Sequence, residues 1–342
     1  MKKKILVTGG AGYIGSHTTV ELQNAGYTVV CIDNLSNSNE ESLNGIEEIT
    51  GIRPNFYKVD CNDKEALANV FEQETNIQGI IHFAASKAVG ESVQKPLLYY
   101  RNNIVPLLNL LELMSVYNVK GFVFSSSCTV YGQPKELPVT ENAPILPATS
   151  PYGNTKQIDE EIIRDTIYAN ANFKAVLLRY FNPIGAHRSA KIGELPLGVP
   201  QNLVPYLTQT AAGIRSELSV FGNDYPTPDG TCIRDFIHVV DLAKAHVKAM
   251  DRMLSGESSE DLEIFNIGTG RGVSVLELIN TFEQTTGVKV PHKITARREG
   301  DIEQVWADPT RANTVLKWKA QSTLEETLQS AWDWQKKITP SK

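Results

Sequence analysis

The chain opens on a short apolar segment that runs directly into a cluster of glycines. Residues 4–8 read KILVT, and the TGGAGYIGS that follows contains Gly9, Gly12 and Gly15. Glycines at this spacing let the backbone turn tightly from a strand into a helix and let a pyrophosphate approach the main chain. The N-terminus of that helix would offer free N–H groups and a positive dipole to the anion. The start of the chain therefore predicts a dinucleotide-binding α/β unit.

Short apolar runs alternate with helix-like stretches through the first half of the chain. Continuous runs of this kind are typical of strands that are buried on both faces, and their alternation with helices implies right-handed crossovers. The predicted fold is therefore α/β, a Rossmann-type doubly wound parallel sheet. We expect strands at 4–8, 28–33, 56–60, 79–84, 121–127 and 174–180, and helices near 13–25, 64–76, 103–118 and 152–171.

After about residue 182 the chain becomes rich in proline and glycine, up to about residue 235. Such loops often carry binding function. A helix near 240–254 and a strand near 263–267 follow, and helices are expected at 274–286 and 323–337. We therefore expect a smaller, loop-rich substrate domain beside the cofactor domain. The predicted division is 1–182 with 240–267 for the cofactor domain, and 183–239 with 268–342 for the substrate domain.

Composition argues against several classes of protein. The 342 residues carry 33 Lys and Arg against 39 Asp and Glu, a net charge of −6, whereas a nucleic-acid binder would have a basic footprint. No stretch approaches the ~20 apolar residues of a membrane span, and the apolar run after the first lysines is shorter than the about 7–15 residues of a secretory signal. The four cysteines have no CxxC spacing and the six histidines are scattered. We therefore expect free thiols, a cytoplasmic location and no metal site.

Asp33 closes the second predicted strand. An acid at this place can hydrogen-bond the ribose hydroxyls of an adenosine and would repel a 2′-phosphate. No arginine follows in VVCIDNLSNSN that could attract such a phosphate. The alternative is a structural glycine turn next to a solvated aspartate. The combination of strand, glycines, helix and acid favours NAD as the cofactor.

The tyrosine–lysine pattern YxxxK occurs twice. In the copy YGQPK a glycine and a proline interrupt any helix. The second copy, Tyr152 to Lys156, follows Ser150, which suits an N-cap, and Pro151, which suits the first helical position. Positions i and i+4 of that helix lie on one face. The second copy therefore places a tyrosine and a lysine side by side.

This pair has a clear chemical use. A free tyrosine has a pKa of about 10, and lowering it to about 7 takes roughly 4 kcal/mol. One positive charge at about 4 Å supplies about that much at an effective dielectric constant of 20. Lys156 could therefore make Tyr152 a base, while a hydroxyl in FSSSCTVYG hydrogen-bonds the substrate oxygen. The alternative is a surface helix pair without catalytic use.

Nearly end to end, the chain resembles the extended short-chain dehydrogenase/reductases, and among them the UDP-galactose (UDP-glucose) 4-epimerases. The blocks that carry the resemblance are LVTGGAGYIGSH, HFAASKAVGESVQKPLLYY, FSSSCTVYG, SPYGNTK, LRYFNPIGAH, FGNDYPTPDGTCIRDFIHVVDLA and RREGDIEQVWAD. The resemblance implies reversible C4 epimerisation of UDP-hexoses through a 4-keto sugar, with tightly held NAD. It also implies a homodimer that pairs through helices of the cofactor domain.

The resemblance assigns roles to matching positions. The catalytic residues would be Ser127, Tyr152 and Lys156. NAD contacts are implied for Gly9, Gly12, Tyr13, Ile14, Gly15, Asp33, Asn34, Asp60, Cys61, Phe83, Ala84, Lys87, Asn102, Tyr152, Lys156 and Phe181. Contacts to the UDP-sugar are implied for Ser127, Tyr152, Asn182, Asn202, Phe221, Arg234, Arg298, Asp301 and Val305. The arginines fit, because a pyrophosphate favours charge-assisted, bidentate partners.

Two positions depart from the family pattern. Cys61 stands where an aliphatic residue is usual, and Val305 stands where enzymes restricted to non-acetylated sugars carry tyrosine. A shorter side chain leaves volume for an acetamido group at C2. The resemblance therefore extends to relatives that also accept UDP-N-acetylglucosamine and UDP-N-acetylgalactosamine.

Four alternatives remain on the same scaffold. A nucleotide-sugar 4,6-dehydratase would carry an Asp–Glu pair just after the catalytic hydroxyl, where this chain has Cys128 and Thr129. A sugar-nucleotide decarboxylase would also need a carboxylate near Thr129. A non-catalytic NAD-sensing protein would not need the intact set of Ser127, Tyr152 and Lys156. A simple dehydrogenase would release NADH.

Overall fold

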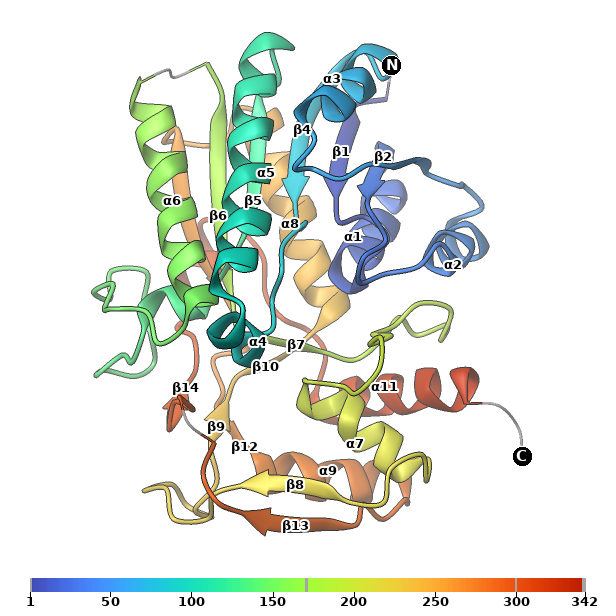
Figure 1. The fold of residues 1–342 in the computed structure, drawn as a ribbon, viewed down its shortest axis with the longest axis vertical. Coiled ribbons are helices and arrows are strands. Elements are labelled where there is room, and N and C mark those ends of the chain that lie inside the picture. Colours follow the sequence, from blue (N-terminus) through green and yellow to red (C-terminus); the bar gives the residue numbers. More distant parts are fainter. Residues whose placement is uncertain (1, 170–171, 299, 340–342) are drawn as a thin grey trace.

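A seven-stranded sheet dominates the computed structural model, which describes residues 2–169, 172–298 and 300–339 (Figure 1). The strand order is β11-β6-β5-β4-β1-β2-β3, and neighbouring strands are parallel. The strands are β1 (Lys4–Thr8), β2 (Thr28–Asp33), β3 (Asn55–Lys58), β4 (Ile77–His82), β5 (Gly121–Ser127), β6 (Lys174–Tyr180) and β11 (Leu262–Ile267).

Helices cover both faces of this sheet. Alternate residues of each strand serve opposite faces, as the pleat requires. In β1, Ile5 and Val7 belong to one apolar cluster and Leu6 belongs to another. The first cluster includes side chains of α1 (Tyr13–Asn24) and α8 (Val239–Leu254). The second includes side chains of α3 (Lys64–Gln73), α5 (Pro96–Val116) and α6 (Pro151–Ala169), which confirms the doubly wound α/β fold.

Three further helical segments lie near the carboxyl ends of the strands. They are α2 (Glu41–Thr50), α4 (Val89–Gln94) and the 3₁₀-helix η1 (Cys128–Tyr131). The predicted helix at 103–118 begins earlier, because Pro96 occupies the first position of α5, where its missing N–H costs nothing. The helix α2 was not predicted, since only Leu43, Gly45 and Ile46 of its ten residues are buried. Its apolar pattern is too sparse to be recognised.

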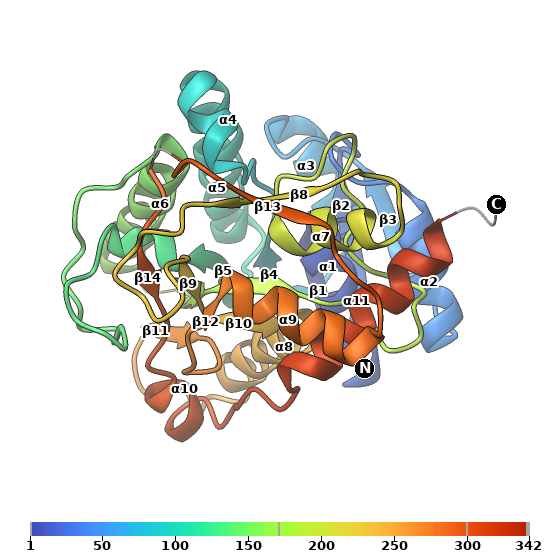
Figure 2. The same ribbon diagram turned by 90° about the horizontal axis from the view of Figure 1, so that it is seen from below.

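The region after residue 182 forms small sheets and helices below the main sheet (Figures 1 and 2). A third apolar cluster holds it together and draws on α7, α9 and α11. Its helices are α7 (Leu203–Ala211), α9 (Val275–Thr286) and α11 (Leu324–Ile338), whereas the short α10 (Thr310–Thr314) packs beside β11 of the main sheet. Its strands are β7 (Asn182–Ile184), β8 (Leu218–Phe221), β9 (Ile233–Arg234), β10 (Phe236–His238), β12 (Val273–Ser274), β13 (His292–Thr295) and β14 (Gln304–Val305).

The chain returns to the main sheet after this loop-rich region. The strand β11 pairs in parallel with β6, with Leu262 opposite Ala175 and Ile267 opposite Tyr180. The helix α8 packs against α1 on one face of the sheet. The segment 240–267 thus belongs structurally to the sheet, while the division into two domains stays a prediction. Within the described ranges, no helix has both the length and the apolar character that crossing a bilayer requires.

Candidate active site

The turn between β1 and α1 is built on close backbone contacts. Gly9 has φ +68°, in the left-handed region that favours glycine, and a Cβ there would come within 3.0 Å of the Ala84 nitrogen. A Cβ on Gly15 would lie only 2.1 Å from the Gly9 carbonyl oxygen. The helix α1 starts after Gly12, and no side chain of the described residues caps it. Its first N–H groups therefore face the cavity in front of the turn.

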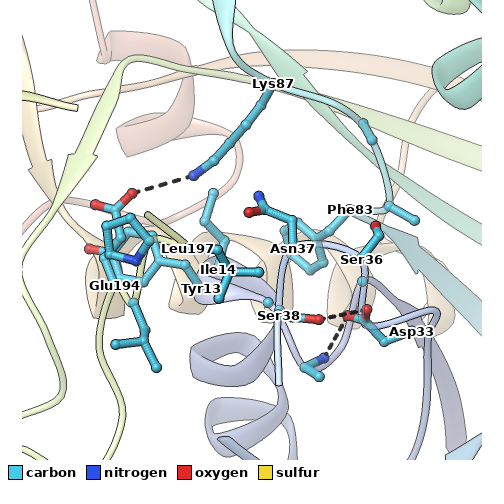
Figure 3. Close-up of a pocket in the computed structure, with 18 of the residues that line it drawn as sticks. Tyr13, Ile14, Asp33, Ser36, Asn37, Ser38, Phe83, Lys87, Glu194 and Leu197 are labelled. Carbon is cyan, nitrogen blue, oxygen red and sulfur yellow. Dashed lines mark hydrogen bonds and ion pairs between the residues drawn. The ribbon is translucent and has the colours of Figure 1, made fainter. Parts of the chain in front are cut away.

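Asp33 holds this turn from the end of β2. One carboxylate oxygen accepts a hydrogen bond from the Ala11 nitrogen at 3.1 Å. The other accepts from the Leu35 nitrogen at 2.9 Å and from the Ser38 hydroxyl at 2.8 Å, and Figure 3 shows the bond between Ser38 and Asp33. Asp33 is buried, and it lines the cavity next to Asn34. The acid predicted from its spacing thus stands where an adenosine ribose would lie against a glycine turn.

A cavity of about 1410 Å³ opens along the carboxyl ends of the strands. Its volume suits a ligand larger than a drug-sized molecule. The residues predicted to contact the cofactor contribute to its wall with one exception, Phe181, which is buried in an apolar cluster beside η1. Those on the wall are Gly9, Gly12, Tyr13, Ile14, Gly15, Asp33, Asn34, Asp60, Cys61, Phe83, Ala84, Lys87, Asn102, Tyr152 and Lys156. The structure gathers them around one cavity, and their contacts to a cofactor stay predictions.

Lys87 reaches across the mouth of this cavity toward the loop-rich region. Its ammonium lies 3.4 Å from a carboxylate oxygen of Glu194 and 5.9 Å from the centre of the Tyr13 ring (Figure 3). The Asn202 amide donates to the same Glu194 oxygen at 2.6 Å. The Trp334 indole of α11 donates to the Glu194 carbonyl oxygen at 2.9 Å. Sequence reasoning did not find Glu194, because it lies in a loop without periodicity.

Tyr152 stands in the first turn of α6. The Ser150 hydroxyl accepts a hydrogen bond from the Gly153 nitrogen at 3.1 Å, which is the cap expected from the sequence. The phenol is buried, and burial raises the pKa of Tyr152 well above its ordinary value. Tyr180 adds to this effect, while a hydrogen bond with Ser127 lowers the pKa. Ser127 at the end of β5 therefore lies within hydrogen-bonding reach of Tyr152.

Lys156 is buried one helical turn further along α6. Its ammonium donates to the Ser125 carbonyl oxygen at 3.0 Å and lies 4.5 Å from the centre of the Phe124 ring. Burial lowers the pKa of Lys156, and the nearby carboxylates Asp159 and Glu160 raise it. The helix thus puts Tyr152 and Lys156 on one face, as predicted. The structure also adds a carboxylate, Asp159, that the sequence reasoning missed.

A second cluster contains predicted substrate residues from distant loops. Arg298 donates to Asp301 with two nitrogens, at 2.6 and 3.1 Å, and Arg234 lies 4.0 Å from the same carboxylate. The guanidinium of Arg298 also lies 5.5 Å from the centre of the Phe221 ring. Hydrogen bonding to Asp301 raises the pKa of Arg298, which keeps it charged. The structure therefore brings four of these predicted residues together into one cationic cluster.

Of the remaining predicted substrate residues, Asn202 lines the cavity beside Glu194, whereas Asn182 and Val305 lie in short strands of the loop-rich region. Val305 in β14 is opposite Arg234 in β9 and is buried in an apolar cluster with Phe181. Asn182 starts β7, directly after Phe181. The Arg234 charge acts on the pKa of Cys128, the residue after Ser127. The second cluster is thus electrostatically coupled to the end of β5.

In the part of the chain that the structure describes, no group of three or more His, Cys, Asp or Glu side chains is placed to hold a metal ion. The four cysteines are free, and burial raises the pKa of Cys31 and of Cys128 to about 12. The thiols next to the turn and next to Ser127 are therefore protonated and act as small apolar side chains.

Comparisons with known proteins agree with this architecture. A family model described as GDP-mannose 4,6 dehydratase matches residues 6–331. The chain is 54% identical to the UDP-glucose 4-epimerase of Bacillus subtilis, over 97% of this chain and 96% of that protein. It is 48% identical to the UDP-glucose 4-epimerase of Bifidobacterium longum, solved in complex with NAD+ and UDP, with a TM-score of 0.94 over 98% of this chain and 99% of that one. It is also similar to the UDP-Glc/GlcNAc 4-epimerase of Campylobacter jejuni, at 37% identity and a TM-score of 0.83, over 98% and 100% of the two chains.

Proposed function

Because the chain belongs to the UDP-glucose 4-epimerase family, we propose that Tyr152, Lys156 and Ser127 carry out the C4 epimerisation of UDP-hexoses. The chain is an NAD-dependent isomerase, and its reaction is the reversible interconversion of UDP-glucose and UDP-galactose. The observation that carries the assignment of residues is the meeting of Tyr152, Lys156 and the glycine turn at one cavity.

The residues of the cavity fit NAD. Gly9 and Gly15 line the cavity at the uncapped start of α1, and a Cβ on Gly15 would clash with the Gly9 carbonyl oxygen, so the tight turn that brings the backbone to a pyrophosphate needs glycine there. The Asp33 oxygen that accepts from the Ala11 nitrogen still has one free lone pair on a carboxylate that lines the cavity, which suits a ribose hydroxyl. The chemistry that NAD+ supplies when bound is reversible hydride transfer at C4 of the sugar, together with one positive charge on its ring.

Tyr152 acts as the base that takes the proton from the 4-hydroxyl and later returns it. Burial raises its pKa, so positive charge is needed to make the phenolate accessible at neutral pH. Lys156 supplies part of that charge from the same face of α6. Ser127 hydrogen-bonds the reacting oxygen as its proton moves, since its hydroxyl already reaches Tyr152. Tyr152 must act on both faces of the sugar, so the 4-keto sugar has to turn between the two half-reactions.

Arg234 and Arg298 anchor the pyrophosphate of the UDP group while the sugar turns. Both guanidiniums share the carboxylate of Asp301, which fixes their orientation. Two charged donors on a pyrophosphate provide binding energy far from the reacting carbon, so the ketone is retained without contacts that would block its rotation. Replacing Arg298 by Lys would keep the charge and lose the bidentate geometry.

Val305 sets the space available to a substituent at C2 of the sugar. It is buried next to Phe181 and stands opposite Arg234 in the paired strands. A tyrosine at this place would project further into the region between the arginines and Tyr152. We therefore assign activity on UDP-N-acetylglucosamine and UDP-N-acetylgalactosamine to this chain as well. Val305→Tyr should abolish turnover of the acetylated pair and spare the plain pair, and unchanged turnover of the acetylated pair would refute this gate.

The 4,6-dehydratase reading is disfavoured by the residues after Ser127. The matching family model carries a dehydratase description, yet desolvation raises the pKa of the partly buried Cys128 thiol to about 12. The neighbouring Thr129 donates its main-chain nitrogen to the Ser127 hydroxyl. Neither side chain can exchange a proton with C5 or C6 of a sugar at neutral pH. Absence of a dehydrated product from any UDP- or GDP-sugar tests this directly.

We also assign a homodimer, a cytoplasmic location and the two-domain division with 240–267 in the cofactor domain. Leu97 and Leu108 of α5 are 81% and 41% exposed and lie on the same helical face. Such a face on a helix of the main sheet suits pairing with a second copy. Free cysteines suit a reducing compartment. Sedimentation of the protein and of Leu97→Glu tests the dimer, because the charge should yield monomers.

The decisive experiment is incubation of the purified protein with each of the four UDP-sugars without added NAD, followed by separation of the products. Epimerised sugar without net NADH is expected. Tyr152→Phe should retain bound dinucleotide and lose turnover, which separates an enzyme from an NAD sensor. Tyr168→Phe on the same helix is the matched control, since Tyr168 is 94% exposed. A protein that contains no dinucleotide and cannot acquire any would contradict the proposal.

A further inference from the structure

Asp159 lies one helical turn beyond Lys156 on α6, and only 1% of its surface is exposed. Neither of its carboxylate oxygens has a hydrogen-bond partner among the described residues. Burial of an ionised carboxylate without partners costs several kcal/mol or more, and a nearby opposite charge is the usual compensation. The surroundings of Asp159 must therefore contain a reason for an acid at this place.

Asp159 shares a helical face with the two groups that carry the reaction. Tyr152, Lys156 and Asp159 follow each other at i, i+4 and i+7, the spacing of one face of a helix. The next residue, Glu160, already has a charged partner. Its carboxylate forms a buried ion pair with Arg179 of β6, at 2.5 and 2.9 Å. Asp159 is therefore the carboxylate that remains available to Lys156.

The other titratable groups on the elements around α6 have partners of their own. On α5 and α4, Tyr99 donates to Glu91 at 3.0 Å. On β4, burial lowers the pKa of His82 to about 3, so its ring is neutral. On β6 and η1, Tyr180 bonds with Ser125, and Tyr131 bonds with Asn266 and Arg179. Tyr100 accepts from Asn154, and the thiol of Cys128 is protonated.

We propose that Asp159 is a positioning residue that keeps Lys156 positively charged beside Tyr152. The inference rests on the proposed function and deepens it, since it names what holds the cation in place. Burial lowers the pKa of Lys156, and among the effects that raise it the charge of Asp159 is the largest. Burial raises the pKa of Asp159 to about 7, and the charge of Lys156 works against this rise, so the carboxylate is ionised above that pH. The Asp159 carboxylate also raises the pKa of Tyr152. It therefore keeps Lys156 charged, which favours the reaction, but it makes the Tyr152 phenol harder to ionise.

The pH optimum of the enzyme should therefore depend on Asp159. The rate is limited on the acid side by protonation of Tyr152 and on the alkaline side by loss of the Lys156 proton. Without the carboxylate, Lys156 gives up its proton at lower pH, and Tyr152 also ionises at lower pH. Both limbs of the pH–rate profile should therefore move to lower pH by about one unit or more.

The test is the pH dependence of kcat for Asp159→Asn and Asp159→Leu in the dinucleotide-loaded protein. Both variants should shift both limbs downward, and Asp159→Glu should restore them in part. Leucine has the same four heavy atoms branching at Cγ, and replacing buried charge by an apolar side chain is often neutral or stabilising, so Asp159→Leu provides a second variant if the asparagine form misfolds. Asp165→Asn, an exposed acid on the same helix, is the matched control and should leave the profile unchanged.

A second readout does not depend on turnover. The phenolate absorbance of Tyr152, measured as the difference from the matching Tyr152→Phe protein, should appear at lower pH in Asp159→Asn than in the parent. A shift of this titration in a protein without epimerase activity would support the charge coupling and refute the proposed function. The proposal would be overturned if the Asp159 variants kept both the pH–rate profile and the Tyr152 titration of the parent. Asp159 would then be only structural, even if the variants had an altered thermal stability.

Discussion

Gly15→Ala is expected to disable the cofactor site without touching any side chain in it. The Cβ of an alanine would lie 2.1 Å from the Gly9 carbonyl oxygen, so the turn has to open by at least about 0.9 Å before this contact reaches 3.0 Å. The Gly9 backbone cannot withdraw freely, because the position of its own missing Cβ is already 3.0 Å from the Ala84 nitrogen on the neighbouring β4 connection. Overpacking of this kind costs about 1–3 kcal/mol. If that cost falls on the bound form, the affinity for NAD drops by about 5- to 140-fold.

The assay is the amount of dinucleotide released by denaturing the purified protein, together with the thermal midpoint with and without added NAD. Gly15→Ala should contain less dinucleotide than the parent and require more NAD to recover its Tm. The control is Gly26→Ala, which has φ +91° and no heavy atom within 4 Å of the added Cβ. It carries only the left-handed strain of about 1–2 kcal/mol and should keep the parent's dinucleotide content. A Gly15→Ala protein with the parent's dinucleotide content and Tm would refute the argument from close approach.

Three further predictions concern charge and protonation. Burial lowers the pKa of His17 and of His82 from 6.5 to about 3. Between pH 3 and pH 6.5 these two rings are therefore protonated in the unfolded chain and neutral in the folded protein. The free energy of unfolding should therefore fall as the pH drops from 6.5 toward 3, by about 1.4 kcal/mol per pH unit for each ring, in urea titrations at successive pH values. Asp33→Ser removes the charge that repels a 2′-phosphate and should narrow the preference for NAD over NADP by about tenfold, measured by reconstitution of the cofactor-free protein with each dinucleotide. Arg179→Met leaves Glu160 buried without its ion-pair partner and should cost about 3–5 kcal/mol, whereas the double variant with Glu160→Leu should recover most of the loss; additive losses would contradict this.

Four strands of the main sheet could be predicted from the sequence with the bounds that the structure shows, at 4–8, 28–33, 121–127 and 174–180. The predicted strands 79–84 and 56–60 lie one or two residues too far along the chain, since β4 spans Ile77–His82 and β3 spans Asn55–Lys58. Strands buried on both faces leave uninterrupted apolar runs, and few other elements do so. The start of α5 could not be located, because Leu97 is 81% exposed and its first turns lack an apolar stripe. The short helix α4 (Val89–Gln94) has only one buried residue, Ser92, so tertiary contacts and not its own pattern define it.

The same distinction holds for the candidate site. The glycine turn and Asp33 could be found by spacing, because they act through local backbone geometry. Glu194 could not, since its role arises from contacts with Lys87 and Trp334, far away in the sequence. Asp159 did leave a signal: an acid stands at a position of α6 where the buried face calls for an apolar residue. Reading each predicted helix for charges on its apolar face would have identified it.

The late arrival of β11 has a consequence for how the protein is made. The strand β6 ends at Tyr180, but its neighbour β11 is complete only at Ile267. At a synthesis rate of about 5–20 residues per second, the edge of β6 waits roughly 4–17 s on the ribosome for the strand that covers it. During that time its open N–H and C=O groups can pair with another nascent chain. Fragments that stop before Leu262 keep this edge permanently open, so incomplete chains should depend on chaperones far more than the finished protein does.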